Sequence, residues 1–206
     1  MKLNIGFDDT DSPRGGCTTY IAALLVERLH DLGASFLDYP RLIRLNPNVP
    51  WKTRGNGALC LRIECEESLL DEIRECVIQA IEENADLEYK GTDPGIVFLY
   101  GDVPDEIRDF SRRAITGLVS MDEALSLIKK YHAEAVGFKR GRGIIGSLAA
   151  IGEELKDDYT YELLAYRVPE NRGTKRRIDA ESVIRMDKEL GSLVFNNFDY
   201  EEGRVL

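Results

Sequence analysis

Three carboxylates lie within four residues near the start of the chain: Asp8, Asp9 and Asp11. Adjacent carboxylates repel one another, so such a cluster is costly unless a cation lies among them. Magnesium accepts hard oxygen ligands of this kind and also holds nucleotide phosphates. The pattern therefore predicts a magnesium-dependent catalytic site in which Asp8, Asp9 and Asp11 bind the metal.

Gly15 and Gly16 follow the acids and precede a helix that we expect to begin near Thr18. The two glycines let the backbone turn tightly and expose its amides, which suits a phosphate group. Thr18 would stand at a helix N-terminus, where an added phosphate is stabilised. An acidic turn that only caps the helix is the simplest alternative. The combination of acids, glycines and threonines between a strand and a helix favours the phosphate site.

Lys52 and Arg54 lie in a glycine-rich loop ahead of an expected strand. Lysine supplies a point charge and arginine a two-pronged donor, so both suit ATP or RNA phosphates. The alternative is an ordinary hairpin, because Asn56-Gly57 is a favoured turn pair.

Residues 141–146 fit the pattern G-x-G-x-x-G, which includes Arg142 and directly follows Lys139 and Arg140. A dinucleotide site needs a buried strand just before this pattern, and residues 131–138 make a poor strand. We expect instead a flexible basic loop that closes over phosphates through Lys139 and Arg142. An interdomain linker is the alternative.

Other kinds of catalytic site find little support. His30 and His132 are lone histidines on or beside expected helices, so we expect them to be structural or solvated. The four cysteines lack paired metal-ligand spacing, and we expect free thiols rather than zinc ligands or disulfides: Cys17, Cys60, Cys65 and Cys76.

The elements that must position these residues follow from hydrophobic periodicity. Strands are expected at 3–7, 58–64, 96–100 and 160–168, and helices at 18–32, 67–83, 104–119 and 120–132. This alternation predicts an α+β fold: an α/β-like sheet domain with packed helices over 1–132, then part of a second α+β domain over 133–206. The acids would follow the first strand, at the end where open α/β sheets bind ligands.

Composition limits the possible partners. The chain has 206 residues, 43% of them hydrophobic, which allows a sizeable core and argues against disorder. The longest wholly apolar run, residues 20–26, is too short to span a bilayer, so we expect a cytoplasmic protein without membrane contact. The formal net charge of −10 repels a polyanion, so any RNA contact must be local, while a cationic substrate would be attracted.

Five segments, in order along the chain, resemble the archaeal tRNA-isoleucine agmatidine (2-agmatinylcytidine) synthetases: residues 6–20, 40–47, 52–58, 141–146 and 161–167. The resemblance implies an ATP-dependent ligase that joins agmatine to the wobble cytidine in the anticodon region of an isoleucine tRNA. It implies that ATP first phosphorylates the C2 carbonyl oxygen of cytidine, and that agmatine then displaces this oxygen. It also implies that the second domain is ferredoxin-like.

The resemblance further assigns roles to individual residues. It implies that Thr18 is autophosphorylated, that the three acids hold magnesium, and that phosphates are contacted by Gly15, Gly16, Lys52 and Arg54. Family members continue into an OB-fold and a zinc ribbon, so we expect this chain alone to modify tRNA poorly. The sequence indicates no oligomeric state.

Two other functions stay open on the sequence. One is a magnesium-dependent phosphohydrolase that uses Asp9 or Asp11, since residues 9–12 partly match phosphatases of the haloacid dehalogenase type. The other is a noncatalytic RNA-binding module. Magnesium-dependent ATP turnover that does not depend on tRNA would favour the first, and RNA binding without ATP consumption would favour the second.

Overall fold

The structure is a computed structural model, and it describes residues 1–53, 55–156, 158–162, 164, 180–193, 198–199 and 204–205. The chain divides into two compact units, Met1–Glu154 and Leu155–Leu206. In the part of the chain that the structure describes, no helix is both long and apolar enough to cross a membrane.

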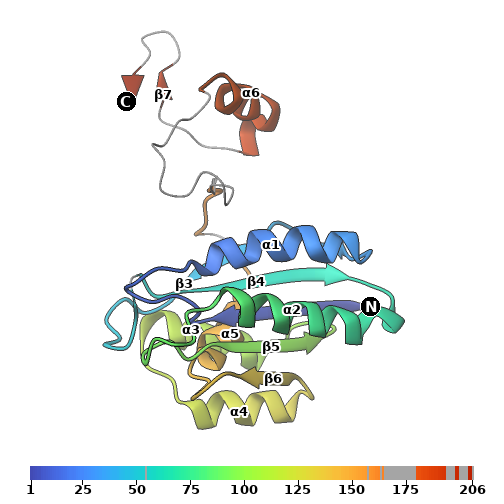
Figure 1. Cartoon of the computed structure of the whole chain (residues 1–206), viewed down its shortest axis with the longest axis vertical. Coiled ribbons are helices and arrows are strands. Elements are labelled where there is room, and N and C mark those ends of the chain that lie inside the picture. The colour runs from blue at the N-terminus through green and yellow to red at the C-terminus, as the bar shows by residue number, and fades with distance from the viewer. Residues whose placement is uncertain are drawn as a thin grey trace. The chain divides into compact units, whose positions relative to one another are not determined.

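A six-stranded antiparallel sheet forms the centre of the first unit (Figure 1). Its strands are β1 (Lys2–Asp8), β2 (Ser35–Phe36), β3 (Arg41–Arg44), β4 (Gly57–Glu64), β5 (Gly95–Tyr100) and β6 (Glu134–Gly137). Their order is β2-β4-β1-β5-β6, and β3 also pairs with β4. Ile5 of β1 lies opposite Leu61 on one side and Phe98 on the other. The acids that follow β1 therefore leave the sheet from its centre.

Two helices cover one face of the sheet: α1 (Thr18–Asp31) and α2 (Leu70–Asn84), the latter preceded by the 3₁₀ turn η1 (Glu67–Leu69). Side chains alternate along a strand, so Leu3, Ile5 and Phe7 share one face, and all three are fully buried. They join apolar residues of α1 and α2 in one hydrophobic core. Burial of this apolar area is the main force that holds the helices on the sheet.

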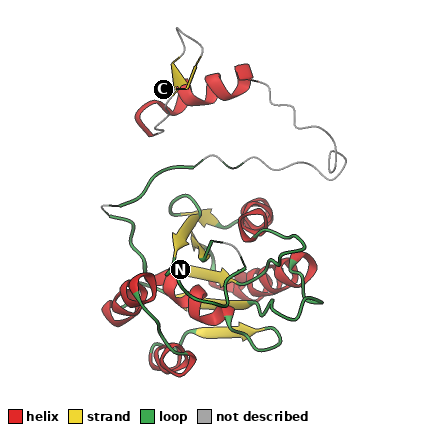
Figure 2. Ribbon diagram, turned by 90° about the vertical axis from the view of Figure 1, so that its left-hand side faces the viewer, coloured by secondary structure: helices red, strands yellow, loops and turns green. Residues whose placement is uncertain are grey.

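Helix α5 (Gly143–Gly152) packs directly on the other face of the sheet, and α3 (Asp105–Thr116) and α4 (Met121–Lys130) pack beside it. Figure 2 shows helices on both sides of the strands. Glycines allow the close approach. A Cβ on Gly6 would lie 2.1 Å from the Ser147 carbonyl oxygen, and one on Gly95 would lie 2.0 Å from the Ile144 nitrogen. The Ser147 hydroxyl donates to the Gly95 carbonyl at 2.9 Å, so α5 is bonded to β5 as well as packed on it.

The predicted α+β fold is confirmed, and the strands and helices expected before residue 132 are present. Ser120 caps α4, because its side chain accepts a hydrogen bond from the Glu123 N–H. The expectation of a ligand crevice like that of open α/β sheets is wrong, because neighbouring strands of the main sheet run antiparallel.

Two interpretations of residues 131–146 are also wrong. Residues 134–137 form β6, because β5 supplies hydrogen bonds that so short a segment cannot make by itself. Residues 143–152 form the buried helix α5 rather than a flexible loop or a linker. The boundary expected after His132 consequently falls inside the first unit, and the chain divides after Glu154.

The second unit contains α6 (Ala180–Leu190), the 3₁₀ turn η3 (Gly191–Leu193), and the paired strands β7 (Phe198–Asp199) and β8 (Arg204–Val205). Most of the strand expected at 160–168 lies outside the described residues. The ferredoxin-like topology of this unit stays a prediction.

Candidate active site

The chain leaves β1 through a turn that its own backbone stabilises. Ser12 and Gly15 pair as an isolated antiparallel bridge, with backbone hydrogen bonds of 2.8 and 3.1 Å. Asp9 has a φ of +61°, in the left-handed region that few non-glycine residues adopt. Gly16 has a φ of +86°, and a Cβ there would lie 3.1 Å from the Asp11 Cα. The turn therefore needs glycine at position 16 and stores strain at Asp9, as functional sites often do.

Asp8 is the last residue of β1, and its carboxylate lies against α5. A Cβ on Gly146 would lie 2.0 Å from Asp8 Oδ2, and one on Gly143 would lie 2.5 Å from the Asp8 carbonyl oxygen. Burial, with the nearby Asp9 charge, raises the pKa of Asp8 to about 8. Gly143 and Gly146 therefore leave room for the end of β1 and the Asp8 carboxylate beside α5.

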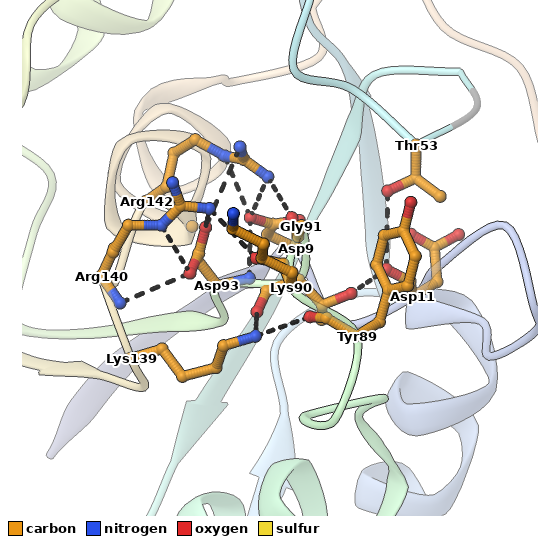
Figure 3. Close-up of polar contacts among 12 residues, drawn as sticks. Asp9, Asp11, Thr53, Tyr89, Lys90, Gly91, Asp93, Lys139, Arg140 and Arg142 are labelled. Carbon is orange, nitrogen blue, oxygen red and sulfur yellow. Dashed lines mark hydrogen bonds and ion pairs between the residues drawn. The ribbon is translucent and has the colours of Figure 1, made fainter.

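Asp9 lies at the centre of an ion-pair network (Figure 3). Arg142 donates to Asp9 Oδ2 through Nε at 3.1 Å and through Nη2 at 2.7 Å, and the Asp93 backbone N–H donates to the same oxygen at 3.2 Å. Burial still raises the pKa of Asp9, although Arg142 opposes the rise. In this structure Arg142 is a counterion of the acidic turn.

Asp93 is the buried anion of this network. Its side chain is 1% exposed, its Oδ1 accepts from Arg140 Nε at 3.1 Å, and its Oδ2 lies 2.7 Å from Arg140 Nη2. Burial opposes ionisation, but the hydrogen bonds from Arg140 lower the pKa of Asp93. Asp93 holds Arg140 in place and lies 3.9 Å from Arg142, so it stabilises the two arginines beside the acidic turn.

Two hydrogen bonds from Lys139 hold the segment that carries Asp93 in place. Its Nζ donates to the carbonyl oxygens of Tyr89 and Thr92 at 2.6 and 2.7 Å. Thr92 is fully buried and donates its hydroxyl to the Asp11 carbonyl at 2.8 Å. In the structure Lys139 and Arg142 thus bind protein oxygens, and their contacts with phosphates stay predictions.

Asp86 anchors the far side of the turn. It accepts from the Ser12 hydroxyl at 2.5 Å and from Arg14 Nε at 2.9 Å, and these bonds lower its pKa, with Arg14 having the larger effect. Its backbone N–H donates to the Thr10 carbonyl at 3.0 Å. Asp86 and Asp93 were both missed from the sequence. The one available signal was the Thr92-Asp93-Pro94-Gly95 turn just before a buried strand.

Thr18 is the first residue of α1, and its side chain faces the acidic turn. The Thr10 hydroxyl donates to Thr18 Oγ1 at 2.9 Å, and both residues are buried. The Thr19 hydroxyl instead lies 2.9 Å from the Cys17 sulfur. The Thr18 hydroxyl is therefore bonded to Thr10, two residues after the end of β1.

The loop that carries Lys52 also reaches the turn. Thr53 Oγ1 donates to the Asp11 carbonyl at 3.5 Å. Lys52 is exposed, and its Nζ donates to the Pro47 carbonyl. Arg54 lies outside the described residues. The structure thus brings residues 8–18, 52–53 and 139–142 together, while the phosphate contacts of Lys52 and Arg54 stay predictions.

The donor set suits a magnesium ion held by one or two carboxylates together with nucleotide phosphates. Asp8 is a buried acid with like-charged neighbours in Asp9 and Asp11, and a cation there would relieve the repulsion. Among the described residues, no three His, Cys, Asp or Glu side chains converge as a complete metal cluster. Magnesium commonly takes few protein ligands and keeps water and phosphate as the others.

We expect Asp93→Asn to lower the free energy of unfolding by about 2 kcal/mol, because an amide cannot neutralise the two arginines. The loss should be smaller than for a wholly buried pair, since Arg140 remains in contact with water. Urea denaturation measures it. The control is Asp102→Asn, which breaks an exposed pair with Lys2 and should change stability little. Equal effects of the two substitutions would contradict a structural role for Asp93.

Two family models match the chain: the TiaS TCKD domain over residues 4–69 and the TiaS FLD domain over residues 141–206. Together they cover more than half of the sequence. The chain belongs to the TiaS family. Helix α5 lies within the FLD match but packs on the sheet of the first unit.

Relatives and solved TiaS structures are similar along nearly the whole chain. The tRNA 2-agmatinylcytidine synthetase TiaS of Pyrococcus horikoshii is 50% identical over 97% of this chain, and that of Methanocaldococcus jannaschii is 46% identical over 100%. A crystal structure of TiaS in complex with an isoleucine tRNA and ATP is 45% identical, with a TM-score of 0.81 over 100% of this chain. A complex of TiaS with an isoleucine tRNA, AMPCPP and agmatine is 42% identical, with a TM-score of 0.77.

The chain spans about half the length of these relatives: 46% and 49% of the two proteins, and 48% and 49% of the two crystallised chains. None of these relatives points to a phosphohydrolase or to a noncatalytic RNA-binding module.

Proposed function

We propose that this chain carries the ATP-using part of an enzyme that joins agmatine to the wobble cytidine of an isoleucine tRNA, in the cytoplasm. The observation that supports the proposal is that three acids and a helix N-terminal threonine lie together at one strained turn. The chain that carries this turn is similar to TiaS along its whole length. Residues 1–154 would form the kinase-like catalytic unit, and residues 155–206 would belong to the second, ferredoxin-like domain.

The reaction has two parts. ATP phosphorylates the C2 carbonyl oxygen of cytidine and so makes that oxygen a leaving group, and the primary amine of agmatine then attacks C2 and displaces it. In the family ATP is split to AMP and two phosphates, and one phosphoryl group passes to Thr18. Positioning and electrostatic stabilisation supply most of the rate in phosphoryl transfer, so the chain needs no covalent catalysis on the base itself.

Each part of the candidate site has a task in this scheme. Asp8 and Asp11 would hold magnesium, with Asp9 neutralised by Arg142. When bound, the metal would neutralise charge on the transferred phosphoryl group. The backbone at Gly15 and Gly16, with Lys52 and Arg54, would bind phosphates, and Thr10 would orient the Thr18 hydroxyl.

The partners follow from charge and access. Agmatine is a cation at both ends, and a chain with a net charge of −10 attracts it. The wobble base must leave the anticodon stack to reach the acids, as happens with bases that enzymes modify.

The test of this proposal is the loss of magnesium-dependent nucleotide turnover in Asp8→Asn, Asp9→Asn and Asp11→Asn. Asparagine keeps the shape and removes the charge, so turnover should fall about 100-fold or more in at least two of the three. Asp102→Asn is the control, because Asp102 is exposed and pairs with Lys2 away from the turn. Unchanged turnover in all three variants would remove the acidic turn from the active site.

A second assay tests how much the domains found in the longer relatives contribute to tRNA modification. Incubation with tRNA, agmatine and ATP, with and without the relatives' OB-fold and zinc ribbon supplied, should give more 2-agmatinylcytidine when they are present.

A further inference from the structure

The loop between β3 and β4 has a base, here called the neck, at Asn46 and Asn56. Hydrogen bonds hold this neck to the rest of the first unit. Asn46 is 8% exposed, and it donates through its backbone N–H to the Ala114 carbonyl at 3.1 Å and through Nδ2 to the Gly117 carbonyl at 2.8 Å. Asn56 Nδ2 donates to the Asn46 carbonyl at 2.9 Å, across the neck. The two asparagines therefore hold the loop at the end of α3.

One side of this loop faces the candidate active site, because Thr53 donates to the Asp11 carbonyl. The loop is thus held at two places, its neck and its contact with the acidic turn. Between Asn46 and Thr53, the exposed residues are Pro47, Asn48, Pro50, Trp51 and Lys52.

The exposed end of the loop carries the one tryptophan of the chain, Trp51, which is 60% exposed. Lys52 follows it and is exposed. Arg44 is exposed too, and its guanidinium lies over the loop, since a Cβ on Gly55 or Gly57 would lie 3.3 Å from its Nη1. The loop thus presents an exposed indole followed directly by an exposed lysine, and an exposed arginine lies over the glycines at its base, on a chain with a net charge of −10.

We propose that Trp51 is a stacking platform for an unpaired nucleobase of the RNA substrate, with Lys52 and Arg44 beside the adjoining phosphates. Every base has a π-face, and proteins that hold single-stranded RNA stack bases on exposed aromatic rings flanked by cations. Net repulsion of RNA by the acidic chain makes such a local surface necessary. The inference rests on the proposed function, in which an unstacked base must reach the acids next to this loop.

The RNA base, not the adenine of ATP, is the occupant that the charges favour. Two cations at the loop that carries the indole can bind phosphates next to a stacked nucleotide in a strand of RNA. The phosphates of ATP, by contrast, would lie at the acidic turn with the metal. The experiment below distinguishes the two sources of a nucleobase.

Intrinsic fluorescence reports directly on Trp51, because no other residue of the chain is a tryptophan. An RNA stem-loop with unpaired cytidines should quench this fluorescence, whereas the same stem closed into a duplex and magnesium-ATP should quench it much less. Quenching by ATP alone, or equal quenching by duplex and stem-loop, would overturn the proposal.

Binding of a labelled stem-loop, followed by fluorescence anisotropy, gives the size of the effect. Trp51→Ala should weaken binding about 10- to 100-fold, as expected for loss of one stacked base, and Trp51→Phe should restore most of it. The matched control is Tyr39→Ala, since Tyr39 is an aromatic residue with the same 60% exposure. Wild-type affinity of Trp51→Ala, or an equal loss in Tyr39→Ala, would contradict a stacking role.

Phosphate transfer from ATP to the chain, measured on the same samples, separates this inference from the proposed function. If phosphate is transferred but the stem-loop neither binds nor quenches, the stacking platform is wrong and the ATP chemistry stands. If Trp51 responds to the stem-loop but no phosphate is transferred, the platform stands and the proposed chemistry fails.

Discussion

Gly6→Ala is expected to unfold the first unit or to lower its free energy of unfolding by at least about 3 kcal/mol. A Cβ at this position would lie 2.1 Å from the Ser147 carbonyl oxygen and 2.8 Å from its carbonyl carbon. Both atoms belong to the backbone of α5, which is buried, so relief requires movement of the whole helix. Because domains are stable by only about 5–15 kcal/mol, this cost is a large share of the total.

Circular dichroism and urea denaturation measure this effect. Gly55→Ala is the control, because a Cβ there would meet the end of the exposed Arg44 side chain, which can move away. A Gly6→Ala variant with the unfolding midpoint of the wild type would mean that α5 does not lie directly on β1.

Incubation with ATP and magnesium is expected to place a phosphate on Thr18 and not on Thr19. Thr18 begins α1, where exposed amides stabilise a phosphate, and its hydroxyl is bonded to Thr10 in the acidic turn. Thr19 is rotated by about 100° round the helix, and its hydroxyl lies beside Cys17.

Mass spectrometry of the peptide that contains both threonines identifies the acceptor. Thr18→Val should abolish incorporation, and Thr19→Val should leave it near the wild-type level. Thr10→Val should keep the acceptor but slow the transfer, because the Thr18 hydroxyl loses its hydrogen-bond donor. Phosphate found solely on Thr19, or intact tRNA modification without any phosphothreonine, would show that Thr18 has been given the wrong role.

The elements with strong periodicity could be predicted from the sequence. The alternation of Leu59, Leu61 and Ile63 predicted β4, and the apolar spacing from Ile21 to Leu29 predicted α1, since each set of side chains lies on one face of its element and joins the same core. β6 could not be found in this way. It has four residues and exists because β5 pairs with it.

Helix α5 was missed because its glycines were interpreted as flexibility. Glycine lowers helix propensity, but in α5 it removes the side chains that would keep the helix away from β1. Tertiary packing outweighs propensity in such a segment. The partners of Lys139 and Arg142 were missed for a different reason: they are Asp9 and residues 89–93, and no local pattern links segments so far apart in sequence.

Placement of α5 on the sheet also sets the order in which the site can form during protein synthesis. Asp9 and Arg142 are 133 positions apart, so β1 leaves the ribosome long before its counterion and its covering helix. Contacts between such distant residues form late in folding, after most of the chain has been made. A nascent chain that ends before Arg142 has an uncovered sheet face and an acidic turn without its counterion, so the candidate site is complete only after α5 has docked.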